Sequence, residues 1–478
     1  MLTNRSSPLY RTALEVPPSP PAYAQPLVVE PDFETEPSRG NDGWMPSGLL
    51  EWFAIGQTAL PALLVLPGTQ PLRFAIRAGA FLVSLAALGY WWAKGRRRVP
   101  VAHPASRWLM VVIAILAVMI AHPDTETLSA GLGQTALYVA VFAPLFWVPA
   151  FVTDRRTLIR VLVILLVCNG INSIVGVLQV YDPARWMPKE FSSTYMLSRD
   201  LMSTAAYVGP NGRLIIRPPG LYDTPGAVCG AGTVAALLGV IFCLEKMAWW
   251  KRILALGFAG AGLAAIYLSQ VRSSLMVALG MLAVYTVLLI LQQQKARAVA
   301  LLGLTGGLVA GALVLATLLG GVSIQNRFST VVQGNPAELY YNSRGNQVQA
   351  VVNNQLWDYP FGAGLARWGV MSGYLGTSPA KQLSAEVQPH AWILDGGILL
   401  LLAYGLALVS TVLWELKLVL RLPDPDDRLW AAAVVAANVG TLALVFTFVP
   451  FATQIGVQFW FLEGLLHGAM TMKLQQWR

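Results

Sequence analysis

Long apolar runs recur along most of the chain, and short polar segments separate them. A helix needs about 20 residues to cross the hydrocarbon core of a bilayer. By that measure the runs predict twelve spanning helices, at 49–67, 74–93, 107–122, 132–152, 157–181, 224–244, 253–270, 273–292, 298–321, 391–419, 429–449 and 453–472. The pattern predicts an all-α polytopic membrane protein whose membrane domain covers residues 49–478.

The loops between these runs alternate in charge. Every second loop is basic, and the basic positions are Arg96 to Arg98, Arg155 and Arg156, Lys246, Lys251 and Arg252, Lys295 and Arg297, Arg421 and Arg428, and Lys473 and Arg478. Short cytoplasmic loops carry an excess of Lys and Arg. We therefore expect these loops and both termini to face the cytoplasm. The membrane that the helices cross is expected to be the cytoplasmic (inner) membrane.

Two of the loops that then face outward are long. One runs from Asp182 to about Asp223, and the other covers residues 321–390. Long loops in compact proteins are usually functional or disordered. The second loop contains aromatic residues, glycine turns and amphipathic stretches such as 347–352. We expect it to fold partly into short helices that lie on the outer membrane surface.

Composition supports the membrane assignment and narrows the possible partners. Hydrophobic residues make up 55% of the chain and charged residues 12%, and the mean hydropathy is +0.56. A soluble domain carries about 25% charged residues. Part of this protein's surface must therefore contact membrane lipid rather than water. The net charge of +9 sits in short loops rather than on a clustered basic face, so no nucleic-acid partner is expected.

The first 48 residues differ from the rest of the chain. They are rich in proline, carry scattered acids and contain no sustained apolar run. Such a composition is typical of a disordered segment, and it lacks the basic start and apolar core of a cleavable signal peptide. We expect a disordered, proline-rich cytoplasmic tail.

Motifs for several kinds of chemistry are missing from the sequence. The three cysteines, Cys168, Cys229 and Cys243, lie in or beside apolar runs and form no disulfide framework or metal spacing. The sequence has no P-loop, GxSxG or HExxH motif, and the loops expected to face outward contain no DxD pair to hold a divalent ion. A reaction at the outer face would therefore need a donor that is already activated, such as a membrane lipid diphosphate.

The outward loops nevertheless hold several arginines, which the positive-inside rule disfavours there. Arg213 and Arg217 precede Tyr222 in one long loop, Arg272 stands at a tight turn between two helices, and Arg327 and Arg344 lie in the other long loop. Each could anchor lipid phosphates or snorkel to the interface. Together they could clamp a diphosphate, since guanidinium matches phosphate oxygens bidentately. The sequence leaves both interpretations open.

Two further features lie at the end of the second long loop. His390 opens the tenth predicted helix and could accept a proton near neutral pH, or could bond locally at the helix start. The segment Tyr359–Gly364, with glycines at 362 and 364, predicts a tight turn, and a phosphate-binding nest is the less favoured alternative.

Taken in order, these segments resemble the family of O-antigen ligases and O-antigen polymerases that share a Wzy-type domain. The segments that carry the resemblance are Arg217–Tyr222, Val271–Ser274, Asn326–Phe328, Asn342–Arg344, Tyr359–Gly364 and His390. The resemblance covers roughly residues 160–470 and implies a GT-C-like fold. It also implies transfer of a glycan from undecaprenyl diphosphate to an acceptor hydroxyl, at the outer face, without metal or cofactor.

The resemblance also implies roles for individual residues. Arg217 and Arg272 would hold the diphosphate and stabilise its charge as it leaves, and His390 would orient or deprotonate the acceptor hydroxyl. The residues expected to bind substrate are Arg213, Tyr222, Arg327 and Arg344.

Several functions remain open at this stage. A ligase would use lipid A-core of lipopolysaccharide as the acceptor. A polymerase would use another lipid-linked repeat of an O-antigen or exopolysaccharide. A related branch of transferases would use a hydroxyl group on a protein. The alternative class is a transporter or flippase for polysaccharide or lipid-linked substrates, which should show midplane charges and broken helices. Apolar segments do hold Arg160, Asp395, Glu415 and Glu463, but mostly near their ends.

Overall fold

The computed structural model describes residues 48–66, 68–94, 101–152, 154–188, 205–375 and 382–476. All of these belong to one compact unit, Pro46–Arg478. The proline-rich segment 1–47, the basic loop at 95–100 and residues 189–204 of the first long loop lie outside the described residues.

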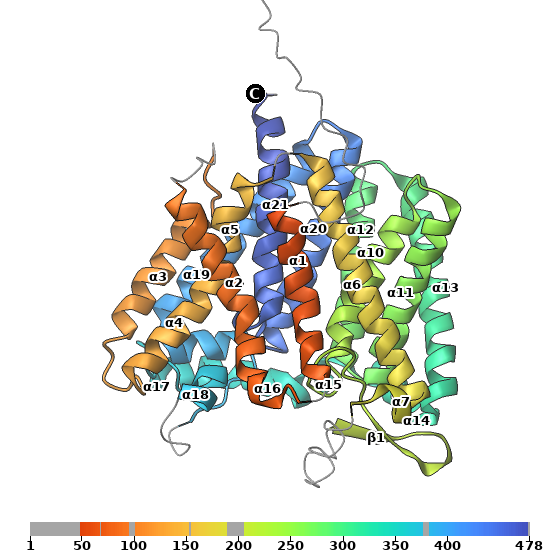
Figure 1. The fold of residues 1–478 in the computed structure, drawn as a ribbon, viewed down its shortest axis with the longest axis horizontal. Helices are drawn as coiled ribbons and strands as arrows, with labels where there is room; N and C mark the ends of the chain where they lie inside the picture. The colour runs from red at the N-terminus through yellow and green to blue at the C-terminus, as the bar shows by residue number, and fades with distance from the viewer. Residues whose placement is uncertain are drawn as a thin grey trace, which may run out of the picture. The chain divides into compact units, whose positions relative to one another are not determined.

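Seven helices in the described residues are long and apolar enough to cross a membrane (Figure 1). They are α2 (Arg73–Ala93), α6 (Arg155–Tyr181), α11 (Trp249–Ser269), α12 (Arg272–Leu291), α13 (Lys295–Gly320), α19 (Gln388–Arg421) and α20 (Pro425–Ala443) continued by η8 (Leu444–Phe446). The protein is therefore an all-α, multi-pass membrane protein.

Five further helical segments cover the remaining apolar runs. One is the bent pair of α4 (Leu128–Phe142) with α5 (Pro144–Trp147) and η3 (Val148–Ala150), which turns by 42°. The others are α1 (Leu49–Ala59) with η1 (Leu60–Val65), α3 (Ser106–Met119), α10 (Val228–Cys243) and α21 (Gln454–Gln476). Every run predicted to span is helical, but seven helices, or eight with the bent pair, pass the length and composition test. The count of twelve spans stays a prediction.

Short elements complete the described chain. A hairpin pairs β1 (Ala206–Val208) with β2 (Leu214–Ile216) in antiparallel register, with Tyr207 opposite Ile215. The other short elements are η2 (Gln70–Leu72), α7 (Pro183–Trp186), η4 (Pro210–Gly212), α14 (Val322–Gln333), α15 (Pro336–Tyr340), η5 (Tyr341–Gly345), α16 (Asn346–Ala350), η6 (Val351–Gln355), α17 (Leu356–Asp358), α18 (Gly369–Leu375) and η9 (Pro450–Ala452).

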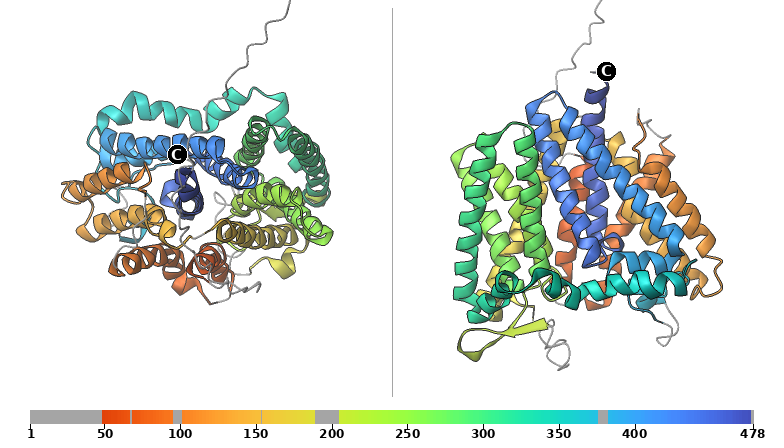
Figure 2. Two further views of the ribbon diagram at one scale, coloured as in Figure 1. Left: turned by 90° about the horizontal axis from the view of Figure 1, so that it is seen from above. Right: turned by 180° about the vertical axis from the view of Figure 1, so that it is seen from behind.

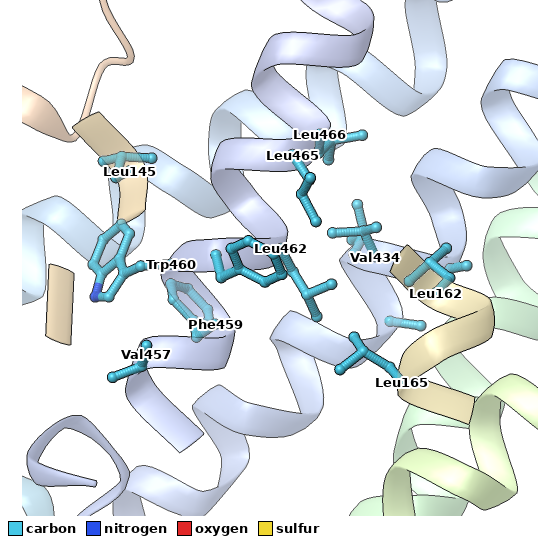
Figure 3. Close-up of a cluster of buried hydrophobic side chains, with 14 of the residues drawn as sticks. Leu145, Leu162, Leu165, Val434, Val457, Phe459, Trp460, Leu462, Leu465 and Leu466 are labelled. Atoms are coloured by element: carbon cyan, nitrogen blue, oxygen red, sulfur yellow. The ribbon is translucent and has the colours of Figure 1, made fainter. Parts of the chain in front are cut away.

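Helix α21 lies inside the bundle, surrounded by the other helices (Figure 2, left). Its buried side chains, including Phe459, Trp460 and Leu462, meet Leu145 of α5, Leu162 of α6 and Val434 of α20 (Figure 3). Because protein rather than lipid surrounds α21, it can carry polar residues such as Glu463 and His467 and need not be as apolar as a lipid-facing span.

The segment from α14 to α17 runs across the ends of the long helices (Figure 2, right). It contains two π-helical stretches, η5 and η6, between its short α-helices. The short helices expected in the second long loop are therefore present. Their position at a membrane surface stays a prediction.

Helix α19 is broken near its start. Gly396 and Gly397 leave helical geometry, and Gly397 has a φ of 65°. The turn at 359–364 fills the break with its backbone, because Ile398 donates to the carbonyl of Pro360 at 3.0 Å and Ala363 donates to that of Leu394 at 2.7 Å. This turn therefore has a structural role, as the sequence favoured over a phosphate nest.

Candidate functional site

A pocket of about 1000 Å³ opens at the end of the bundle where the hairpin and α14 lie (Figure 1). Three connections form its wall: the hairpin residues 208–210, the turn between α11 and α12, and the corner between α13 and α14. Arg272 and Arg327 both line it. These connections are far apart in sequence, so the pocket is a property of the fold.

Two backbone features shape this wall. Gly321 has a φ of 80°, which lets α13 turn sharply into α14, and a Cβ there would lie 3.0 Å from the backbone nitrogen of Pro210. Gln270 has a φ of 55° and ends α11 in the left-handed conformation. Its side-chain amide donates to the hydroxyl of Ser323 at 3.1 Å. The α11–α12 turn is thereby tied to α14.

Three half-buried arginines lie at or near this pocket: Arg272 and Arg327 line it, and Arg217 is close enough for its charge to act on Arg327. Arg272 is the first residue of α12, and its Nη1 donates to the hydroxyl of Thr330 at 3.0 Å. The same hydroxyl donates to the carbonyl of Arg327, at 2.8 Å. Arg217 follows β2, and its backbone N–H donates to the carbonyl of Ala205 at 2.8 Å. Rigid elements therefore position all three arginines.

The three positive charges act on one another. Burial lowers the pKa of Arg327, and the charges of Arg272 and Arg217 lower it further. Burial also lowers the pKa of Arg217. The Nε atoms of Arg217 and Arg327 are buried without a hydrogen-bond partner among the described residues. Such a cluster favours an anion in the pocket.

No described carboxylate forms an ion pair with any of the three arginines. The nearest acid in sequence to Arg217, Asp223, is bound instead by Arg73 at 2.6 Å and Arg77 at 2.8 Å, both from α2. Burial alone would raise the pKa of Asp223, but hydrogen bonds from Arg77 and Arg73 hold it below its usual value. Asp223 therefore ties its loop to α2 and leaves the pocket positive.

Two residues expected to bind substrate lie elsewhere. Burial raises the pKa of Tyr222 to about 12. Arg213 is exposed on the hairpin. Neither residue lines the pocket. The loop that carries Tyr222 is held against α6, because Asn172 of α6 accepts from the backbone N–H of Leu221 at 2.8 Å.

His390 and Arg344 belong to a second group, at the start of α19. The Nδ1 atom of half-buried His390 lies 3.4 Å from the side-chain amide of Gln355. Arg344 pairs with Glu386, which also accepts from Gln347 at 2.6 Å. The charge of Arg344 is thus balanced, unlike the charges of the arginines at the pocket. Among the described residues no hydrogen bond or ion pair joins the two groups, which the α14–α17 segment connects along the chain.

The sequence interpretation named Arg327 but did not single out the polar residues Ser323 and Thr330, which lie on the same helix and also line the pocket. Ser323, Asn326, Arg327 and Thr330 all line the pocket from α14. Their spacing of three, four and seven residues from Ser323 is that of one helix face. That periodicity was the signal that could have revealed a polar helix face there.

The described residues contain no group of three or more His, Cys, Asp or Glu that could hold a metal ion. Comparison with known proteins supplies no relative, since no family model matches the chain and no curated protein matches its sequence.

Proposed function

We propose that this protein transfers a glycan from an undecaprenyl-diphosphate-linked donor to an acceptor hydroxyl, at the outer face of the cytoplasmic membrane. One observation supports this most directly: Arg272 and Arg327 line one pocket, Arg217 lies close enough to act on Arg327, and none of the three pairs with a described acid. A diphosphate supplies the negative charge and the bidentate acceptors that guanidinium groups match. The start of α12 adds the positive end of a helix dipole.

The chemistry follows from the leaving group. The acceptor oxygen attacks the anomeric carbon of the donor sugar and forms the new glycosidic bond. The bond from that carbon to the phosphate oxygen breaks, and its electron pair stays on undecaprenyl diphosphate. The arginines stabilise this developing charge, which lowers the barrier more than it stabilises the bound donor.

His390 would take the proton that the acceptor hydroxyl loses. With its amide turned so that Oε1, which has no described partner, faces Nδ1, Gln355 would accept from Nδ1–H, orient the ring and leave Nε2 free to take this proton. For direct transfer, the hydroxyl at His390 must reach the sugar carbon attached to the bound diphosphate. The α14–α17 segment, which carries Arg327 at one end and Gln355 near the other, would set that separation.

The acceptor defines the subgroup within this proposal. Lipid A-core would make the protein an O-antigen ligase, a second lipid-linked repeat would make it an O-antigen or exopolysaccharide polymerase, and a hydroxyl on a protein would make it an O-glycosylating transferase.

A transporter of a lipid-linked substrate is the second candidate, and one observation favours it. The break at Gly396 and Gly397 in α19 lies beside Asp395, which is fully buried and accepts from Gln134 at 2.9 Å and Tyr138 at 2.8 Å. Broken helices with buried charges are typical of transporters. If the protein is a glycan transferase, the same break has only a structural role, because it accommodates the turn at 359–364.

One experiment separates the two candidates. The purified protein is incubated with undecaprenyl-diphosphate-linked oligosaccharide and candidate acceptors, and both the glycan product and free undecaprenyl diphosphate are measured. A transferase releases undecaprenyl diphosphate in step with product, whereas a transporter leaves the donor bond whole. Arg217→Ala, Arg272→Ala and His390→Ala should each abolish release.

The matched control is Arg185→Ala. Arg185 is exposed on α7, where it lies over the ring of Trp186, and it does not line the pocket. This variant should keep wild-type activity. Full activity in all three site variants would refute the assigned residues, and intact donor under every condition would refute the transferase.

A further inference from the structure

Two acids meet deep inside the bundle, away from the arginine pocket. Glu415 of α19 and Glu463 of α21 are both fully buried. The side-chain amide of Asn438, on α20, lies 2.5 Å from Oε1 of Glu415 and 3.3 Å from Oε2 of Glu463. One amide and two acids thus join three central helices.

A histidine reaches this pair from the segment before α3. The Nε2 atom of His103 lies 2.7 Å from Oε1 of Glu463, although off the line of a well-formed hydrogen bond. Its Nδ1 accepts from the backbone N–H of Ala105 at 3.2 Å. Because Nδ1 acts as the acceptor, the ring holds its single proton on Nε2, facing Glu463. His103 is therefore neutral, and its Nε2–H lies close to Glu463 without forming a well-aligned hydrogen bond.

A second histidine, His467, lies about one helical turn after Glu463 on α21. The ring of His467 is 5.1 Å from that of His103, centroid to centroid. Its Nε2 lies 2.8 Å from the carbonyl of Val101, which can only accept, and its Nδ1 lies 3.0 Å from the hydroxyl of Thr471. His467 thus carries a proton on Nε2.

Nothing in the described residues offsets the charge of two ionised acids here. No described Lys or Arg forms an ion pair with Glu415 or Glu463. The neighbouring helices α5 and α6 pack apolar side chains such as Leu145 and Leu162 around α21, the helix that carries Glu463 (Figure 3). Arg160 of α6 lies 3.7 Å from Glu51 instead. His103 and His467 are the other titratable groups at this site.

Two carboxyl groups that share a fully buried site oppose ionising together, because each charge repels the other and burial disfavours both charged forms. Oε2 of Glu415 and Oδ1 of Asn438 are also buried without a donor among the described residues, so the side chains here offer more acceptors than donors. We propose that Glu415, Glu463 and His103 form a proton-binding site within the helix bundle, in which the acid pair retains one proton at neutral pH.

Such a site has a consequence for the fold. Loss of the proton would leave two negative charges between α19, α20 and α21. The proton would therefore determine whether these central helices pack as observed. Glycosyl transfer at the arginine pocket does not require this proton, so the inference is independent of the proposed function.

Infrared spectroscopy tests the proposal directly, because a protonated carboxyl group has a C=O stretch distinct from that of a carboxylate and shifted in heavy water. The purified wild type at neutral pH should show this band. Its intensity should fall in the double variant Glu415→Gln/Glu463→Gln, which keeps the shape of both side chains. The control is Asp395→Asn, which removes a different buried acid and should leave the band of the pair in place.

Three results would overturn the proposal. One is a wild-type protein without any protonated-carboxyl band, which needs no variant to observe and would mean that both acids are ionised or that the proton sits on His103. Another is an identical band in the wild type and the double variant. The last is a band lost completely in Asp395→Asn, which would assign the proton to that acid alone.

Discussion

At the scale of single residues, Arg272 and Arg327 at the pocket and Arg217 beside it are half-buried and form no ion pair with a described acid. A buried donor without a partner costs about 1–3 kcal/mol, and Arg217 and Arg327 each have one. Arg344, by contrast, pairs with Glu386. The sequence identifies all of these arginines as unusual outward charges. It cannot distinguish the paired from the unpaired, because Glu386 is 42 positions from Arg344.

The unpaired state of Arg327 leads to a prediction. Arg327→Ala should weaken binding of a prenyl diphosphate about 10- to 100-fold, since a hydrogen bond to a charged group contributes about 1.5–3 kcal/mol. The measurement is the Kd in detergent by titration calorimetry. Arg185→Ala on α7 serves as the charge-matched control and should bind as the wild type does. Equal affinity in both variants would mean that Arg327 does not contact the diphosphate.

At the scale of elements, the helices could be predicted and their interruption could not. Apolar runs predict α19 as one helix from 391 to 419, but the helix starts at Gln388 and breaks at Gly396. Glycine pairs are common in spanning helices, so their presence alone does not predict a break. The break needs the backbone of residues 360–363 to replace the lost helical hydrogen bonds. Those residues are distant in sequence and carry no local signal for this contact.

Substitution within α19 tests this break. Gly397→Ala should destabilise the protein, because the left-handed conformation costs about 1–2 kcal/mol and the new Cβ would clash with the carbonyl of Pro360. Gly405→Ala, in the same helix with no atom within 4 Å of its Cβ, should be neutral or slightly stabilising. Unfolding temperatures in detergent measure both effects. A Gly397→Ala protein as stable as Gly405→Ala would show that α19 can run unbroken.

The contact between α2 and the Arg217 loop gives a pH-dependent prediction. Burial alone would raise the pKa of Asp223 above its ordinary 3.8, but the hydrogen bonds and charges of Arg77 and Arg73 hold it below that value. A depressed carboxyl pKa contributes stability that is present above the unfolded value and is lost as the pH falls through the folded one. The wild type should therefore lose more stability than Asp223→Asn as the pH drops below about 4. Parallel pH–stability curves would show that this ion pair contributes nothing.

At the scale of the whole molecule, hydropathy finds the helices but does not decide which of them contact lipid. All twelve predicted runs are helical in the described chain. Helix α21, however, carries buried polar residues and is not among the helices that are long and apolar enough to cross a membrane. Helix α13 is the opposite case, with many exposed apolar side chains such as Leu302 and Leu318. A hydrophobicity average reports neither situation, because burial by protein and burial by lipid both favour apolar residues.

The arrangement across the membrane can be tested at α13. Lys295 begins this helix and Glu338 follows it in α15, and both are exposed. In a background where Ala replaces Cys168, Cys229 and Cys243, an impermeant maleimide added to intact spheroplasts should label Glu338→Cys but not Lys295→Cys. Detergent permeabilisation should expose the second site. Labelling of both positions from the same side would mean that α13 does not cross, and the outward placement of Arg327 and His390 would then fail with it.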